Sequence, residues 1–99
     1  MFTGIVKEMG KVISINQGPD CKLIEIACSK ILSDIAIGDS VAVDGCCLTA
    51  KKISRDSFIC DISYSTIEKT NFSDIKTGRM LILESSLTLN GKIGGHFVI

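Results

Sequence analysis

A chain of 99 residues with 45% hydrophobic content has room for one small domain with a single core. Eleven basic and eleven acidic side chains give a formal net charge of zero, which argues against nucleic acid and against a membrane surface as partners. The N-terminus lacks the leader of a signal peptide, and no segment approaches the roughly 20 apolar residues of a membrane span. We therefore expect a cytoplasmic protein with one domain over residues 1–99.

The first expected element is one long, bent strand over residues 2–15, in which Gly4 and Gly10 mark bulges or bends. The turn formers at 16–20 lead into a strand at 21–28 that returns as a hairpin partner. Residues 29–39 are the clearest short helix, with Ser29 as its N-cap. We expect this helix to plug one end of a barrel.

The second half of the chain also reads as strands. Residues 40–54 form either two strands around an Asp44-Gly45 turn or one strand bulged at Gly45. A strand is expected at 56–66, a polar loop with about one helical turn at 64–75, and strands at 79–87 and 94–99. About six short strands with little helix indicate an all-β antiparallel barrel or sandwich.

Cysteine chemistry offers few sharp alternatives. The five cysteines are Cys21, Cys28, Cys46, Cys47 and Cys60, an odd number that favours reduced thiols in a chain without a leader. A zinc site is not expected, because no Cys-x-x-Cys occurs and His96 is the only histidine. The same lone histidine gives little support to a thiolate nucleophile. In a strand, Cys46 and Cys47 point to opposite faces, so one packs in the core and the other faces away.

Four segments carry a resemblance that covers essentially the whole chain. They are MFTGIV, GDSVAVDGCCLT, FICDISYSTIEKTNF and GGHFV, and they occur in this order. Together they resemble the N-terminal lumazine-binding domain of the riboflavin synthase (alpha chain) family. The resemblance implies a closed six-stranded antiparallel Greek-key β-barrel with one or two short helices. Family members carry two such barrels in tandem, so we expect this chain to be the N-terminal half of a two-barrel enzyme, with the second barrel absent.

The resemblance also implies a reaction. In that family, one molecule of 6,7-dimethyl-8-ribityllumazine gives a four-carbon unit to a second one, which yields riboflavin and 5-amino-6-ribitylamino-uracil. No metal or organic cofactor is implied, and orienting two stacked rings is the protein's main task. The family's productive site forms between barrels of different subunits in a homotrimer. We therefore expect the isolated chain to bind the ligand with little turnover and to form a homodimer.

Site residues follow from the resemblance, position by position. It implies substrate contacts for Gly4, Ile5, Val6, Cys47, Leu48, Thr49, Asp61, Ile62, Ser63, Tyr64, Ser65 and Thr66, and catalytic contributions from Phe2 and Cys47. The hydroxyl groups of the DISYST segment suit a polyol. Without the resemblance, the apolar members are ordinary barrel core, and the serines and Thr66 are turn or capping residues.

Two other functions stay open. A non-catalytic lumazine-binding carrier, similar to the lumazine proteins, would share the fold and the ligand. A flavin-binding barrel of the reductase type is a third option, but ISYSTIEKT matches its Arg-x-Tyr-Ser-like segment only faintly and no Gly-rich nucleotide-binding loop accompanies it.

Overall fold

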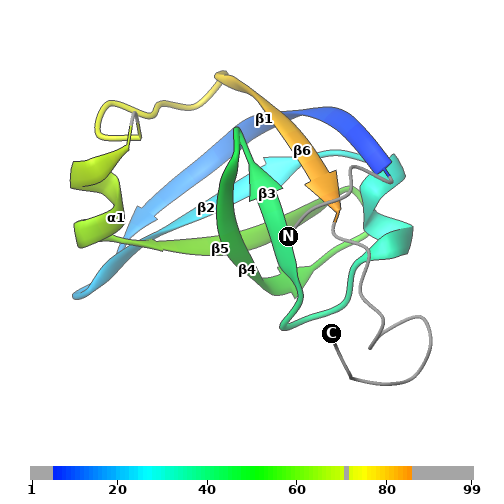
Figure 1. Ribbon diagram of the computed structural model, residues 1–99, viewed down its shortest axis with the longest axis horizontal. Helices are drawn as coiled ribbons and strands as arrows, with labels where there is room; N and C mark the ends of the chain where they lie inside the picture. Colours follow the sequence, from blue (N-terminus) through cyan, green and yellow to red (C-terminus); the bar gives the residue numbers. More distant parts are fainter. Residues whose placement is uncertain (1–5, 71, 86–99) are drawn as a thin grey trace.

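The computed structural model describes residues 6–70 and 72–85, and these form a closed barrel (Figure 1). Its six strands are β1 (Val6–Gln17), β2 (Cys21–Ala27), β3 (Ser40–Val43), β4 (Cys46–Ile53), β5 (Ser57–Ser63) and β6 (Met80–Ser85). They follow one another around the barrel in the order β1-β2-β5-β4-β3-β6, and every neighbouring pair is antiparallel. The expected all-β Greek-key barrel is therefore confirmed. The strand expected at 94–99 lies outside the described residues.

Strand β1 is long and bent, as its sequence predicts. Its first half pairs with β6 and its second half with β2, and the register shifts between Val12 and Ser14. Gly10 lies where the strand passes over the core. A Cβ atom there would lie 2.6 Å from Ile26 Cγ2 and from Leu83 Cδ1, so a larger residue would collide with two packed side chains.

A two-residue turn joins β3 to β4. Asp44 and Gly45 both have positive φ, at 49° and 85°, which is the geometry of a type I′ hairpin turn. Of the two interpretations open for residues 40–54, the structure has the two strands around a turn. The turn is also bound to β6, because the backbone N–H of Ile82 donates to Asp44 Oδ1 at 2.7 Å.

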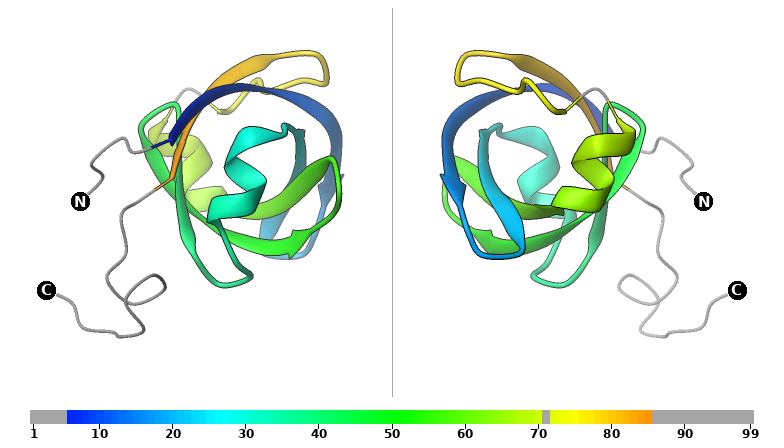
Figure 2. Two further views of the ribbon diagram at one scale, coloured as in Figure 1. Left: turned by 90° about the vertical axis from the view of Figure 1, so that its right-hand side faces the viewer. Right: turned by 90° about the vertical axis from the view of Figure 1, so that its left-hand side faces the viewer.

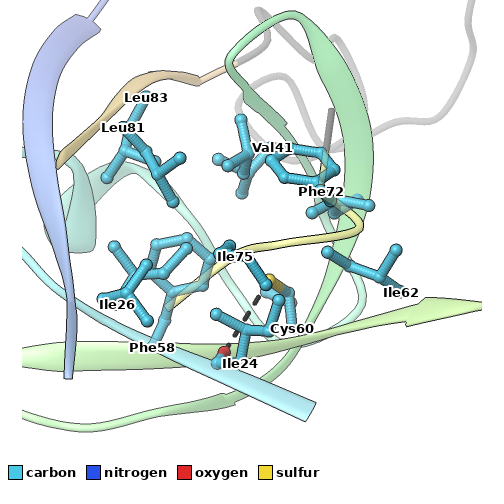
Figure 3. Close-up of a cluster of buried hydrophobic side chains, with 14 of the residues drawn as sticks. Ile24, Ile26, Val41, Phe58, Cys60, Ile62, Phe72, Ile75, Leu81 and Leu83 are labelled. Atoms are coloured by element: carbon cyan, nitrogen blue, oxygen red, sulfur yellow. Dashed lines mark hydrogen bonds between the residues drawn. The ribbon is translucent and has the colours of Figure 1, made fainter. Parts of the chain in front are cut away.

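The core fills the barrel with the inward side chains of all six strands (Figure 3). Strand alternation sends residues such as Ile24, Ile26 and Phe58 inside. Phe72 and Ile75 point into the same cluster from the segment between the last helix and β6, where they are 1% and 6% exposed. The interpretation of that segment as a polar loop was therefore wrong at these positions, because its two apolar side chains pack into the barrel.

Two short helices lie at opposite ends of the barrel (Figure 2). The 3-10 helix η1 (Lys30–Asp34) closes one end, as expected, and α1 (Tyr64–Lys69) lies at the other. Ser29 occupies the N-cap position of η1, but its side chain accepts no capping hydrogen bond. The carboxylate of Glu8 on β1 does so instead, since it accepts from the backbone N–H of Ser29 at 2.7 Å and of Ile31 at 2.9 Å. Ser29 is therefore the N-cap residue, as expected, but the capping carboxylate comes from the barrel wall.

The outer surface of β1 and β6 is apolar at several positions. Met9 and Ile82 are direct cross-strand partners and are 53% and 46% exposed. Ile13 and Met80 are also exposed on the same two strands. Within residues 6–70 and 72–85, neither helix has the length and apolar character that crossing a membrane requires.

Candidate functional site

A groove opens where two neighbouring strands part. Strands β4 and β5 pair from Ile53–Phe58 as far as Thr49–Asp61. Beyond that last pair, β4 continues alongside β3 and β5 continues alongside β2. The groove has a volume of about 530 Å³, which lies within the range of about 300–1,000 Å³ that small-molecule sites occupy.

Nine residues line the groove: Asp20, Cys21, Cys47, Leu48, Thr49, Asp61, Ile62, Ser63 and Thr66. Seven of them are among the twelve substrate contacts expected from the sequence. Asp20 and Cys21 were missed, and they come from the turn before β2 and from its first residue. The pairing of Cys21 with Ser63 brings them to the site. The sequence shows the turn itself, but not that β2 runs beside β5.

Strand alternation decides which side chains the groove receives. Leu48 and Ile62 belong to the buried core and are only 6% and 1% exposed, so their side chains are directed into the barrel. Cys46 also packs against the core, while Cys47 is exposed on the outer face, as the alternation predicts. Thr49 is half-buried beside it. Strand β4 therefore presents an outward-facing thiol and a hydroxyl to the groove.

The backbone directions follow from the hydrogen bonds at the strand ends. Ala50 exchanges hydrogen bonds with the segment before β3, because its N–H donates to Asp39 and its carbonyl accepts from Gly38. Alternate residues of an antiparallel strand bond to opposite neighbours, so Cys47 and Thr49 direct their backbone groups toward β5. Ser57 accepts from Ser54 at the other end of β5, and the same alternation turns Asp61 and Ser63 toward β4.

Thr49 and Asp61 are the last cross-strand partners, so the backbone groups of Cys47 and Ser63 face the groove from opposite walls. Cys47 offers an N–H donor and a carbonyl acceptor there, whereas Ser63 offers its N–H, because the carbonyl of an N-cap residue accepts the first hydrogen bond of its helix. A flat molecule with polar groups on its rim can occupy the position of that missing pair.

The hydroxyl groups at the groove are held by the start of α1. The Ser63 side chain accepts from the backbone N–H of Thr66 at 3.1 Å and donates to Thr66 Oγ1 at 2.9 Å. Residues three apart share one face of a helix, which is why both reach the groove while Ser65 does not line it. Tyr64 does not line it either, because its hydroxyl donates to the carbonyl of Gly18 at 2.9 Å.

The N-terminal part of the expected site is only partly described. Phe2, Gly4 and Ile5 lie outside the described residues, so their expected roles stay predictions. Val6 begins β1 opposite Ser85. Cys47, the other expected catalytic residue, is an exposed free thiol at the groove. In the part of the chain that the structure describes, no cluster of three or more His, Cys, Asp or Glu residues could hold a metal ion.

Comparison with known proteins gives a consistent result. The family model of the lumazine binding domain matches residues 3–86. Riboflavin synthase of Bacillus subtilis (strain 168) is 40% identical over 98 residues, which are 99% of this chain and 46% of that protein. Riboflavin synthase of Actinobacillus pleuropneumoniae is 36% identical over 98 residues, with the same two shares. The chain spans about half the length of these relatives.

Solved structures give the same picture. A crystal structure of LumP complexed with riboflavin is 34% identical, with a TM-score of 0.76 over 86% of this chain and 46% of that one. A crystal structure of LumP complexed with 6,7-dimethyl-8-(1'-D-ribityl) lumazine is 30% identical, with a TM-score of 0.78 over 100% of this chain and 52% of that one.

Proposed function

The chain belongs to the lumazine-binding domain family, and on that premise we propose that its groove binds 6,7-dimethyl-8-ribityllumazine and riboflavin. The observation that carries the proposal is the split between β4 and β5, where the backbone groups of Cys47 and Ser63 face one volume. The rim of the heterocycle carries amide-like donors and acceptors that can pair with both strand edges. The hydroxyls of Thr49, Ser63 and Thr66 suit the ribityl chain.

The proposed role is that of the N-terminal barrel of a riboflavin synthase. The dismutation joins two lumazine molecules, so it requires two ligands held with their rings together. One groove of this kind supplies one of them, and a second barrel or a second copy must supply the other. We therefore expect the isolated chain to bind ligand with little turnover, with Cys47 beside the bound ring.

A non-catalytic carrier is the second candidate. It is favoured by the similarity to LumP, whose structures contain riboflavin in one case and the ribityllumazine in the other. Both candidates use the same groove and the same ligand. They differ in whether two bound ligands ever meet.

A titration with 6,7-dimethyl-8-ribityllumazine tests the shared binding function, and it separates the two candidates if riboflavin forms. Ligand fluorescence reports binding, and chromatography of the same sample reports riboflavin. Saturable binding without product supports a binding barrel that needs a second barrel for turnover, or a carrier. Product formation would favour the synthase. Absence of saturable binding would contradict the proposed function.

Thr49→Val tests the polar wall of the groove. The substitution keeps the β-branched shape and removes one hydroxyl, so we expect ligand affinity to fall by about 1 to 2 kcal/mol through a lost hydrogen bond. Thr77→Val is the matched control, since Thr77 is exposed in the turn before β6. Equal dissociation constants for the two variants would remove Thr49 from the ligand site.

Self-association of the isolated barrel stays a prediction, as do its cytoplasmic location and its single-domain extent. Met9 and Ile82 place apolar surface on the outside of β1 and β6, and a second copy could cover it. We expect a homodimer in light scattering at micromolar concentration. If light scattering gave a monomeric mass for the wild type, and the same mass for Ile82→Lys, the predicted homodimer would be contradicted.

A further inference from the structure

We propose that Asp20 and Asp61 make the groove selective by charge: it accepts a heterocycle with an uncharged polyol side chain and rejects the same molecule when that chain ends in a phosphate ester. The inference rests on the proposed ligand class. The two carboxylates would let the groove distinguish between related ligands, which the barrel fold by itself does not do.

The two carboxylates bracket the groove along the strand direction. Cys21 pairs with Ser63 across β2 and β5, and Cys47 faces Ser63 from β4. Asp61 lies two residues before Ser63, where β4 and β5 come together. Asp20 lies on the other side of this row, one residue before Cys21 in the turn from β1. A side chain that leaves the groove along the strands in either direction therefore meets a carboxylate.

Positive charge near the groove is sparse. The nine described lining residues include no Lys, Arg or His. Lys51 Nζ lies 3.8 Å from Asp61 Oδ2, but both side chains are partly exposed, at 52% and 32%, so water screens this pair. Asp20 is exposed, and no ion pair of its carboxylate occurs within the described part of the chain. The lining thus carries the carboxylates of Asp20 and Asp61, and the only nearby positive charge among the described ion pairs is Lys51 at its edge.

This arrangement treats the two ligand forms differently. Hydroxyl groups of a polyol can donate hydrogen bonds to carboxylates, which accept only. A phosphate monoester carries a charge of about −1.5 to −2 at pH 7 and offers acceptor oxygens, so it is repelled by the same groups. Placing like charge against an unwanted ligand is a common source of specificity. The groove would thereby stay available when phosphorylated flavins are present.

Binding of riboflavin and of riboflavin 5′-phosphate to the 99-residue chain tests the proposal. Quenching of flavin fluorescence gives both dissociation constants for the wild type, Asp20→Asn, Asp61→Asn and the double variant. The readout is the ratio of the two constants, because Asp61 or Asp20 can also affect riboflavin itself. We expect the wild type to prefer riboflavin by about tenfold or more at low salt, and added salt to reduce this ratio. We expect the double variant to bring the ratio close to one.

Asp56→Asn is the matched control, since Asp56 is exposed in the turn at the far end of β5 from Ser63. It should keep the wild-type ratio. Because Asp20 lies in an exposed turn, Asp20→Asn should fold, and it still tests the charge selection if Asp61→Asn does not fold. Equal affinity of the wild type for both flavins, or a ratio that the double variant leaves unchanged, would overturn the charge selection while leaving ligand binding intact. Failure of the wild type to bind either flavin would overturn the proposed function itself.

Discussion

The two ends of the barrel are each closed by a short helix, but different parts of the chain hold these helices. At one end, the first amides of η1 are bound by Glu8, a residue of β1 more than 20 positions earlier. At the other end, the N-cap of α1 is Ser63, the residue immediately before the helix. The first arrangement ties a helix to the barrel wall. The second needs no distant partner and places its capping residue at the groove.

The Glu8 carboxylate also has a shifted acidity. Burial raises its pKa, but the backbone hydrogen bonds from Ile31 and Ser29, together with the Ser29 hydroxyl, outweigh this effect. The net pKa of Glu8 lies below its ordinary value of 4.5. Folding thus favours the charged form of this side chain.

Glu8→Gln should break the long-range cap and give the largest effect on stability. One carboxylate oxygen accepts from Ser29 and the other from Ile31, so an amide in that place turns an NH₂ group toward a donor. We expect the free energy of unfolding to fall by about 2 kcal/mol, measured by urea denaturation near pH 7. Ligand affinity should not change in the folded protein, because η1 lies at the end opposite α1.

The pH dependence gives this prediction its sign. A group whose pKa is lowered by folding stabilises the protein above its unfolded-state pKa, and this contribution is lost as the pH falls through the folded-state value. The difference in the free energy of unfolding between the wild type and Glu8→Gln should therefore be largest above pH 4.5 and should become smaller below it. Glu68→Gln, at an exposed position of α1, is the control and should change stability by less than about 0.5 kcal/mol. A gap that widens in acid would contradict the assigned role of Glu8.

Ser63→Ala removes the local cap of α1 and should change stability less than loss of the Glu8 cap of η1. Loss of a serine N-cap costs about 1 kcal/mol, which chemical denaturation can measure. Because Ser63 also lines the groove, this variant should weaken lumazine binding in the fluorescence titration, whereas Glu8→Gln should not. Ser73→Ala, at an exposed loop position, is the control. If Ser63→Ala changed stability and left binding intact, α1 would be independent of the site.

The same contrast explains which features the sequence could predict. Within the described residues, local signals predicted the strands, the turns and the position of both short helices, since alternation and turn residues act over a few positions. The capping role considered for Ser63 is also local, and the structure has it. The Glu8 cap was not predictable, because it depends on β1 passing beside η1. Phe72 and Ile75 were misjudged for a similar reason, since their burial depends on how the loop folds back.

The residues of the groove also divide into those that local sequence patterns predict and those that depend on the pairing of distant strands. Cys47, Thr49 and Asp61 were predicted and do line the groove, but the side chains of their neighbours Leu48 and Ile62 are buried in the core. The alternation that places Cys46 and Cys47 on opposite faces also turns Leu48 inward, so this could have been predicted. Asp20 is different: it reaches the groove only because β2 runs beside β5, and no local pattern indicates that pairing.

Closure of the barrel also has a consequence for synthesis of the chain. Lys11 of β1 pairs with Met80 of β6, so the first described strand cannot complete its pairing until the last one has been synthesised. At ~5–20 residues per second on the ribosome, that interval is roughly 4 to 14 s. During this time one edge of β1 has no partner and is open to pairing with other chains. Lys7 and Lys11 alternate with Met9 and Ile13 along β1, and charged side chains on an unpaired strand disfavour such pairing.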